Sequence, residues 1–385
     1  MKILFLTTLD PREHPSLWSG ITLSILKGLE SQGHTVQVRT IGHTAIHPYG
    51  ALKWRLYRWF AGKQYFIEYD PVDVWFNRRR MKRQLRGVEF DLVFSWHPWH
   101  LLLVQTDKPK VFWYDTTFIK TQPMYFPDLS RESLRSALFL DGTAAREAAA
   151  AIYPSEWARQ SAITDYGVPA DRAHAIPFGA NTACPSAEQV ADAIQRRCTR
   201  SDRTVRLLFV GVDWGRKGGR TAVQVTREIN RRGVPARLIV VGCRPELSPA
   251  DMEFVEIVGM LDKSKPDELA RLRSLYLDSD FFIMTSRAES YGIVYCEAMS
   301  NGLPSLATGT GGVEQMVRNE VTGCLAEWGP QTVSNLADFV VRHWSNPAVY
   351  RSLAESSYRT FHTEFSWEVN WKKLGKLLEQ IQGKA

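Results

Sequence analysis

The sequence predicts an α/β protein with two doubly wound, Rossmann-like domains. Short apolar runs alternate with segments of helical length in two separate series along the chain. Glycine-rich turns follow several of these runs directly, as they do where parallel strands end in ligand-binding loops. At 385 residues the chain also exceeds the size at which a single hydrophobic core keeps growing. We therefore expect two domains rather than one.

The first series predicts the N-terminal domain, residues 1–180. A strand over residues 3–7 precedes a helix over residues 21–32, which Gly33 can end, and a second strand follows over residues 35–39. Strand, helix and strand at this spacing form a βαβ unit, so the strands must be parallel. Further apolar runs continue the sheet at residues 92–94, 111–113 and 151–153.

The second series predicts the C-terminal domain, residues 204–365. Its expected strands are residues 207–210, 238–241, 281–284 and 305–307, separated by segments of helical length, and a further strand is expected at about residues 255–258. Between the two series, residues 181–203 follow a stretch rich in proline and glycine and are largely polar, which suits a linker. Residues 366–385 carry a stripe of Trp and Leu at helical spacing and predict a closing helix.

Composition excludes several classes of protein. The five cysteines show no metal-ligand or disulfide spacing, and no apolar run reaches the roughly 18 residues of a membrane-spanning helix. We expect a cytoplasmic protein. The net charge is +7, and residues 51–86 alone hold ten Lys or Arg against three acids. The basicity is local, which disfavours a nucleic-acid-binding surface spread over the whole chain.

The most informative segment is residues 285–312, TSRAESYGIVYCEAMSNGLPSLATGTGG. An apolar strand precedes it, and a helix is expected to begin at Gly292. The free N–H groups of a first helical turn and the positive end of its dipole suit a phosphate. Glu289 and Glu297 lie on either side of this turn, where Glu297 can accept hydrogen bonds from sugar hydroxyls.

The E-x7-E spacing with Tyr-Gly inside it, followed by AMSNGLP and GTGG, resembles the signature of glycosyltransferase family 4. The resemblance extends over most of the chain and implies the GT-B fold, two Rossmann-like domains facing a central cleft, with the last helix packed back on the N-terminal domain. It also implies that Glu289 lies beside the donor sugar and that Glu297 binds the ribose. The donor-binding residues expected from it are Gly20, Met260, Ser290, Tyr291, Gly292, Ile293, Val294, Glu297 and Gly311.

A second phosphate element follows the strand at residues 207–210, with the sequence VGVDWGRKGGR. Its glycines allow close backbone approach, and Arg216 and Lys217 supply positive charge for a diphosphate. Members of the family carry an arginine where this chain has Val212, so Arg216 is the candidate to replace it. A solvent-exposed basic turn is the structural alternative.

The N-terminal half carries the expected acceptor side. His97, Trp99 and His100 follow a strand at the edge where doubly wound sheets bind ligands, although a packed loop with satisfied histidines explains them equally well. Asp115 occupies the place where many relatives carry a histidine near the donor sugar. We predict a catalytic or positioning role for it, with a turn cap as the alternative.

The implied reaction is transfer of a sugar, with retention at the anomeric carbon, from a nucleoside diphosphate to an acceptor hydroxyl on a glycan, a lipid-linked acceptor or a small glycoside. Glu289, Lys217, Arg216 and Asp115 are the expected catalytic residues. No D-x-D signature is evident among these motifs, so we expect no metal and no other cofactor. A nucleotide-sugar epimerase, a phosphorylase or a non-catalytic sugar or membrane adaptor on the same fold are the alternatives.

Residues 51–86 interleave cations with aromatics, as in KWRLYRWF at residues 53–60. Such a segment suits peripheral contact with an anionic membrane at the inner face. Contact with an acidic or phosphorylated acceptor, or a solvated helix whose aromatics pack inward, are alternatives that the pattern leaves open.

Overall fold

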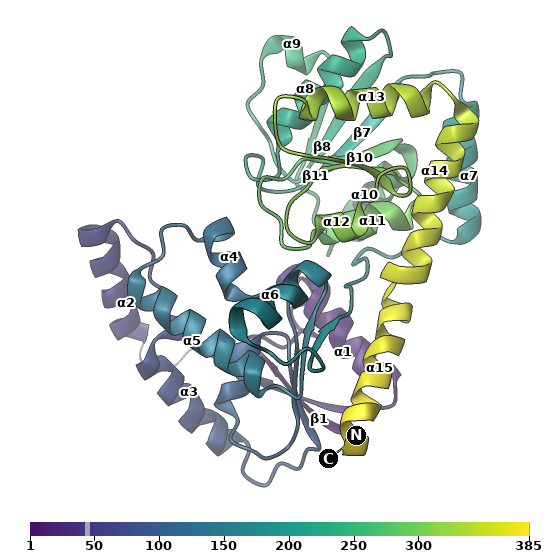
Figure 1. The fold of residues 1–385 in the computed structure, drawn as a ribbon. Coiled ribbons are helices and arrows are strands. Elements are labelled where there is room, and N and C mark those ends of the chain that lie inside the picture. The colour runs from purple at the N-terminus through teal and green to yellow at the C-terminus, as the bar shows by residue number, and fades with distance from the viewer. Residues whose placement is uncertain (43–46, 385) are drawn as a thin grey trace. The chain divides into compact units, whose positions relative to one another are not determined.

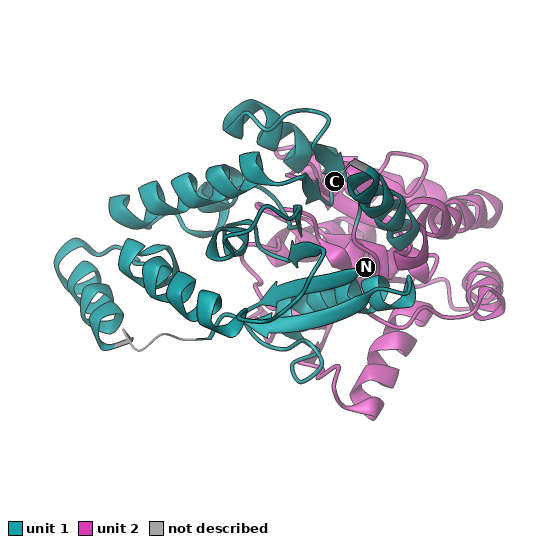
Figure 2. Cartoon of the chain, turned by 90° about the horizontal axis from the view of Figure 1, so that it is seen from below, with its two compact units in different colours: residues 1–177, 370–385 teal, residues 178–369 magenta. Residues whose placement is uncertain are grey.

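The computed structural model describes residues 1–42 and 47–384, and the chain divides into two compact units (Figure 2). Unit 1 holds residues 1–177 and 370–385, and unit 2 holds residues 178–369. Each unit is built on its own parallel sheet.

The sheet of unit 1 has the strand order β2-β1-β3-β4-β5-β6, and all its pairings are parallel (Figure 1). Its strands are β1 (Lys2–Thr7), β2 (Thr35–Thr40), β3 (Leu92–Ser95), β4 (Lys110–Trp113), β5 (Ala150–Tyr153) and β6 (Ala173–Ala175). The five predicted strands are confirmed, and β6 was not predicted. The chain leaves β1 toward β2 on one side and returns to β3 on the other, which creates a switch point between β1 and β3.

Helices flank this sheet because amphipathic segments bury their apolar faces on it. In unit 1 they are η1 (Leu17–Gly20), α1 (Ile21–Ser31), α2 (His47–Leu56), η2 (Tyr57–Ala61), η3 (Ile67–Tyr69), α3 (Pro71–Gln84), η4 (Pro98–Leu103), α4 (Phe118–Tyr125), α5 (Arg131–Glu147), α6 (Glu156–Tyr166) and most of α15 (Trp367–Lys384). Capping side chains and glycines determine where several of these helices begin and end. The Ser130 side chain accepts a hydrogen bond from the Ser133 N–H at the start of α5, and Gly167, at φ +69°, ends α6.

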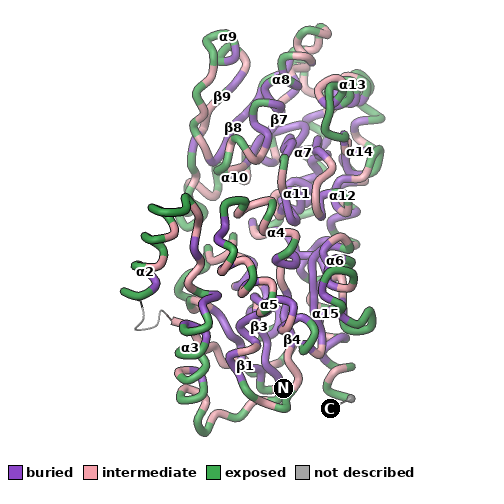
Figure 3. Tube along the Cα trace, turned by 60° about the vertical axis from the view of Figure 1, so that its left-hand side comes forward, coloured by how far each residue is buried: buried purple, intermediate pink, exposed green. Residues whose placement is uncertain are grey.

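The sheet of unit 2 has the order β12-β11-β10-β7-β8-β9 and is also parallel throughout. Its strands are β7 (Val205–Val210), β8 (Ala236–Val241), β9 (Val255–Gly259), β10 (Phe281–Met284), β11 (Ser305–Thr308) and β12 (Gly323–Ala326). Here the switch point lies between β7 and β10. Figure 3 shows that strands such as β3 and β7 are mostly buried, as continuous apolar runs in a two-sided sheet must be.

The helices of unit 2 surround its sheet in the same way. They are α7 (Ala187–Thr199), α8 (Gly219–Arg231), α9 (Pro249–Met252), α10 (Pro266–Asp278), α11 (Ile293–Ser300), α12 (Val313–Met316), α13 (Thr332–Trp344), α14 (Pro347–Thr360) and η5 (Phe361–Phe365).

The division of the chain differs from the predicted linker at residues 181–203. That range contains α7, which begins at a capping box of Ser186 and Gln189 and belongs to unit 2. Arg197 of α7 is 1% exposed and donates hydrogen bonds to the carbonyls of Asn301 and Gly302 at 3.1 and 2.9 Å. The polar residues that suggested a linker therefore include a buried structural arginine.

The closing helix forms as predicted, and from residue 370 onward it belongs to unit 1. Leu374 and Leu378 of α15 are fully buried, and the Trp371 ring lies against Gly28 of α1. A Cβ atom at Gly28 would lie 2.3 Å from that ring, so the close packing of the two helices requires glycine there.

Candidate functional site

The switch point of unit 2 brings two glycine-rich loops together. Residues 211–218 follow β7 and residues 285–292 follow β10, at the carboxyl ends of adjacent parallel strands. Gly218, at φ +75°, makes the approach feasible because a Cβ atom there would lie 1.8 Å from the Thr285 carbonyl oxygen. The Thr285 hydroxyl donates to the Gly218 carbonyl at 2.8 Å, and the Arg287 N–H donates to the Arg216 carbonyl at 2.8 Å. The backbones of the two predicted phosphate elements thus hold each other.

Both cations of the first loop contact one carboxylate of the second. Lys217 Nζ lies 2.5 Å from Glu289 Oε2, and Arg216 Nη1 lies 3.6 Å from the same oxygen. Arg216 is held in this direction by the Ala288 carbonyl at 2.9 Å and the Asp213 carboxylate at 3.2 Å. The side chains of Lys217 and Glu289 are only 13% and 9% exposed, so the pair is weakly screened by water. The position of the missing family arginine, Val212, is 66% exposed.

Helix α11 begins beside this carboxylate, as predicted from Gly292. Gly292 has φ +88°, and a Cβ atom there would lie 3.2 Å from Glu289 Cγ and 2.8 Å from the Tyr295 ring. Ile293 and Val294 open the helix and are half-buried. The Tyr295 N–H donates to the Gly292 carbonyl at 2.9 Å. The N–H groups of the first residues of a helix have no acceptor within it, so those of Ile293 and Val294 can receive an anion.

The GTGG segment closes the same loop from the other side. Gly311 has φ +56°, and a Cβ atom there would lie 2.0 Å from the Glu289 carbonyl oxygen. The Gly312 N–H donates to the Ser290 carbonyl at 3.0 Å. Backbone contacts therefore place Gly311 next to Glu289 and Ser290. Only the backbone of Tyr291 is available to a donor, because its buried hydroxyl donates to the Phe178 carbonyl at 2.8 Å.

The second glutamate, Glu297, is fully buried and already has two partners. Lys263 Nζ lies 2.7 Å from Oε1, and the Tyr276 hydroxyl donates to Oε2 at 3.0 Å. Burial raises the pKa of Tyr276 well above its usual value, so this tyrosine remains a donor. Sequence reasoning missed both partners. It indicated Met260, which follows β9 and is 63% exposed, three residues before Lys263.

Unit 1 has a cavity of about 740 Å³ at its own switch point. Its walls come from the residues that follow β1, β2, β3 and β4, together with η3, α3 and α4. The lining residues are Thr8, Leu9, Ile41, Gly42, Phe66, Ile67, Glu68, Tyr69, Asp73, Asn77, Trp96, His97, Trp99, His100, Tyr114, Phe118, Thr121 and Phe126. We call this cavity the unit 1 pocket. It contains all three predicted acceptor residues.

These three residues, His97, Trp99 and His100, are buried and packed together. The His97 and His100 ring centroids lie 5.2 Å apart, and Trp99 lies 4.8 Å from His100. His97 Nε2 is 3.4 Å from the Tyr69 hydroxyl, and His100 Nδ1 is 3.1 Å from Ser95 Oγ. Burial lowers the pKa of His97 to about 3 and lowers the pKa of His100 well below its ordinary value. Both rings are uncharged at neutral pH.

The other two predicted residues of unit 1 lie near the pocket but do not line it. Asp115 is half-buried in the bend after β4, next to Tyr114. Gly20 has φ +84° and follows two non-glycine residues, Trp18 and Ser19, with φ +48° and +56°. The Trp18 ring packs at 5.4 Å from Tyr114, so this strained loop covers part of the pocket wall.

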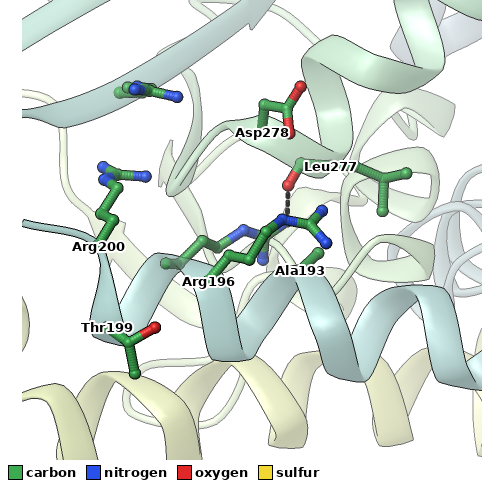
Figure 4. A pocket seen from close by; sticks show the side chains of 8 residues that line it. Ala193, Arg196, Thr199, Arg200, Leu277 and Asp278 are labelled. Atoms are coloured by element: carbon green, nitrogen blue, oxygen red, sulfur yellow. Dashed lines mark hydrogen bonds between the residues drawn. The ribbon is translucent and has the colours of Figure 1, made fainter. Parts of the chain in front are cut away.

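Another hollow, of about 330 Å³, is lined by arginines of α7 and of β7 (Figure 4). The guanidinium groups of Arg197 and Arg200 hold neighbouring segments of the fold together. Arg197 donates to the Leu277 carbonyl at 3.0 Å, and Arg200 donates to the Thr204 carbonyl at 2.6 Å and to the buried carboxylate of Asp280 at 2.5 Å. We interpret this hollow as structural.

The basic aromatic segment exposes most of its large rings. Trp54, Trp59 and Phe60 are 50%, 81% and 83% exposed, and Figure 3 shows exposed stretches along α2 and α3. Lys53 instead points inward, with Nζ 2.9 Å from Asp70 Oδ2 and in contact with Glu132. The interpretation of inward-packed aromatics is therefore wrong for these three rings. None of the helices that the structure describes has the length and apolarity to cross a bilayer.

Two family models match the chain. The one for Glycosyltransferase Family 4 matches residues 21–183, and the one for Glycosyl transferases group 1 matches residues 204–346. Together they cover more than three quarters of the sequence.

Curated relatives match in part. The chain is 29% identical over 139 residues to N-acetyl-alpha-D-glucosaminyl L-malate synthase of Bacillus anthracis, with 35% of each chain covered. It is 25% identical over 248 residues to alpha-D-kanosaminyltransferase of Streptomyces kanamyceticus, with 62% of each covered. The chain thus spans between about one third and two thirds of the length of these relatives. Among solved structures, Anabaena HepE in complex with UDP-glucose is similar over 99% of this chain and 100% of its own, with 17% identity and a TM-score of 0.64.

Proposed function

We propose that this chain, which belongs to glycosyltransferase family 4, transfers a sugar from a nucleoside-diphosphate sugar to a hydroxyl group of an acceptor. The observation that carries the proposal is the pairing of Lys217 with Glu289 beside the N-terminus of α11. Cations and helix N–H groups suit a diphosphate, and a carboxylate among them suits a sugar that develops positive charge. That a solved neighbour binds UDP-glucose supports a donor of this class.

In the proposed reaction, the bond between the donor sugar's anomeric carbon and the diphosphate oxygen breaks, and its electron pair stays on the diphosphate. The acceptor oxygen bonds to the anomeric carbon on the same face, and its proton leaves with the diphosphate. Lys217, Arg216 and the first turn of α11 stabilise the leaving charge. Glu289 positions the sugar and offsets positive charge on its ring, and Glu297 binds the ribose.

We propose that this reaction needs no metal, because the positive charge for the diphosphate comes from Lys217 and Arg216. No group of three His, Cys, Asp or Glu side chains suited to a metal occurs in residues 1–42 and 47–384. We assign His97, Trp99 and His100 to the acceptor site. Asp115, half-buried in the bend after β4, stays a predicted catalytic residue.

Product analysis tests the function. Each nucleotide sugar is incubated with the protein and EDTA, with and without a panel of simple sugars, glycosides and lipid-linked sugars. Nucleoside diphosphate formed only with an acceptor, together with a glycoside of unchanged anomeric configuration, is the expected result. Release without an acceptor indicates hydrolysis, and an altered sugar still attached to the nucleotide indicates an epimerase. Donor binding with no turnover under any condition indicates an adaptor.

We also propose that residues 51–86 attach the protein to an anionic membrane surface. Trp59 and Phe60 are more than four-fifths exposed at the end of the α2–η2 segment, and Arg55 and Arg58 flank them. On α3, Trp75 is 46% exposed, with the Arg79 guanidinium 3.9 Å above its ring. Exposed aromatics between cations are typical of interfacial binding.

A further inference from the structure

We propose that the unit 1 pocket binds an uncharged hydroxylated ring of the acceptor and selects against an acceptor that places a phosphate or carboxylate there. This inference rests on the proposed function, because it assigns the pocket to the acceptor of that reaction. It names the chemical class of an acceptor that the family leaves open.

The pocket is roomy, and many of its walls are aromatic. At about 740 Å³ the pocket is large enough for a sugar ring with an attached group. Five of the aromatic rings that line it come from η3, η4, α4 and the loops after β3 and β4: Tyr69, Trp99, Phe118, Trp96 and Tyr114. Tyr69 makes edge contacts with Trp99 and Phe118 at 6.0 and 5.4 Å, so the walls support one another. Flat apolar walls of this kind suit the face of a ring.

Two buried polar atoms of the pocket residues lack a hydrogen-bond partner. Trp96 Nε1 and His97 Nδ1 are both buried, and neither has a hydrogen-bond partner among the described residues. Both residues line the pocket, and they are adjacent in sequence. Buried polar groups are nearly always satisfied, so such a pair in a pocket wall indicates a polar ligand. A hydroxyl group can accept from the indole N–H and also donate to, or accept from, an imidazole nitrogen.

The charged residues that line the pocket are acidic. Glu68 and Asp73 both line the pocket, whereas no Lys or Arg occurs among its described lining residues. Burial keeps both histidines uncharged at neutral pH by lowering the pKa of each. Phosphate and carboxylate groups in proteins are typically held by Arg or Lys. Here an anion would lose its hydration and meet two carboxylates instead.

A matched pair of probes tests this inference in the 385-residue chain, saturated with whichever of UDP, GDP, ADP and dTDP stabilises it most. Phenyl β-D-glucoside and its 6-phosphate differ only in charge and the phosphate group, and saturation-transfer NMR measures the binding of each. We expect the neutral probe to bind saturably and the phosphorylated probe to bind at least tenfold more weakly. Trp96→Phe keeps an aromatic ring but removes the N–H, and should weaken the neutral probe about fivefold. Equal or tighter binding of the phosphorylated probe, no saturable binding of the neutral probe, or no effect of Trp96→Phe would overturn the inference.

A charge-reversal variant provides an independent check. Glu68 is exposed at the edge of the pocket, so Glu68→Lys should fold, and it should strengthen binding of the phosphorylated probe about tenfold relative to the neutral probe. No gain for the phosphorylated probe would contradict the electrostatic argument. Stabilisation of the same samples by a nucleoside diphosphate reports on unit 2 separately. If one of UDP, GDP, ADP and dTDP stabilises the protein but the probes reverse their order, only this inference fails. If none of the four stabilises it, the proposed function fails.

Discussion

Glu289 is the residue on which the proposed chemistry depends most. It is 7% exposed and accepts from Lys217 within a site that its own loop and the GTGG segment enclose. We predict that Glu289→Gln, which keeps the volume and removes the charge, lowers kcat by about 100-fold or more, in the range found for the loss of one preorganised electrostatic contact. Initial rates of nucleoside diphosphate release measure this. Glu256→Gln, at an exposed carboxylate of β9, serves as the control, and an unchanged rate for Glu289→Gln would remove Glu289 from the mechanism.

The buried histidine His97 predicts a dependence of stability on pH. Its folded-state pKa of about 3 lies below the unfolded value of 6.5, so between these values the unfolded chain binds a proton that the folded chain does not. Stability therefore rises with pH across this window and falls on acidification below pH 6.5. We expect the change in unfolding free energy between pH 7.5 and 5.5 to be smaller by about 1 kcal/mol in His97→Asn.

Urea unfolding of wild type and variant at both pH values measures that difference. His14→Asn, at an exposed histidine, should leave the pH dependence as it is in wild type. If His97→Asn and wild type lose the same free energy on acidification, His97 is not held neutral by burial.

Among single residues, the structure brings the predicted Arg216 and Lys217 to Glu289, whereas the sequence does not predict the partners of Glu297. The sequence predicts Glu289, Gly292 and Lys217 as site residues because each belongs to a short glycine-containing motif that follows a strand. The contacts of Lys263 and Tyr276 with Glu297 depend on where β9 and α10 end in space, and no local pattern encodes that. The inward direction of Lys53 similarly depends on Asp70 and Glu132, which lie 17 and 79 residues away.

Among the elements, strands were predictable where they are apolar and buried on both faces. The two that were missed, β6 and β12, are only three and four residues long, with the sequences AHA and GCLA. Such segments lack the β-branched and aromatic residues that mark a strand. They pair because neighbouring strands already offer a free edge, which is a property of the assembled sheet.

The loop that carries Gly311 provides a test of how tightly the site is built. A Cβ atom there meets the Glu289 carbonyl, and the positive φ adds strain, so Gly311→Ala should reduce stability by more than about 2 kcal/mol. Gly233→Ala is the matched control, because φ is +82° but nothing lies within 4 Å. It should cost about 1 kcal/mol. Equal losses in denaturant unfolding would mean that the close approach at Gly311 does not constrain the loop.

The α2–η2 segment predicts membrane binding through particular rings. The protein should sediment with vesicles of phosphatidylcholine and phosphatidylglycerol but much less with phosphatidylcholine alone, and salt should weaken the binding. Trp59→Ser with Phe60→Ser should reduce the bound fraction strongly. Phe139→Ser, at a 68% exposed ring of α5 in the same unit, should not. Binding that ignores lipid charge, or that survives the double change, would argue against this surface.

At the scale of the whole molecule, the chain length and the two series of strands predicted two α/β units, and the structure has them. The two parallel sheets, together with the likeness to a solved structure over 99% of this chain, confirm the predicted GT-B fold. The boundaries were less predictable. Residues 181–203 are polar because α7 is a surface helix with one buried arginine, and polarity alone does not distinguish such a helix from a linker.

The most direct test of the central claim is donor binding, because every proposed role in unit 2 depends on it. Thermal unfolding is followed with UDP-, GDP-, ADP- and dTDP-sugars, for wild type, Lys217→Ala and the control Arg237→Ala at an exposed cation of β8. A ligand at 100 times its Kd stabilises the folded state by about 2.7 kcal/mol. We predict that the sugars of one nucleotide raise Tm in wild type and in Arg237→Ala and raise it much less in Lys217→Ala. No rise with any nucleotide sugar, or an equal rise in Lys217→Ala, would contradict the account.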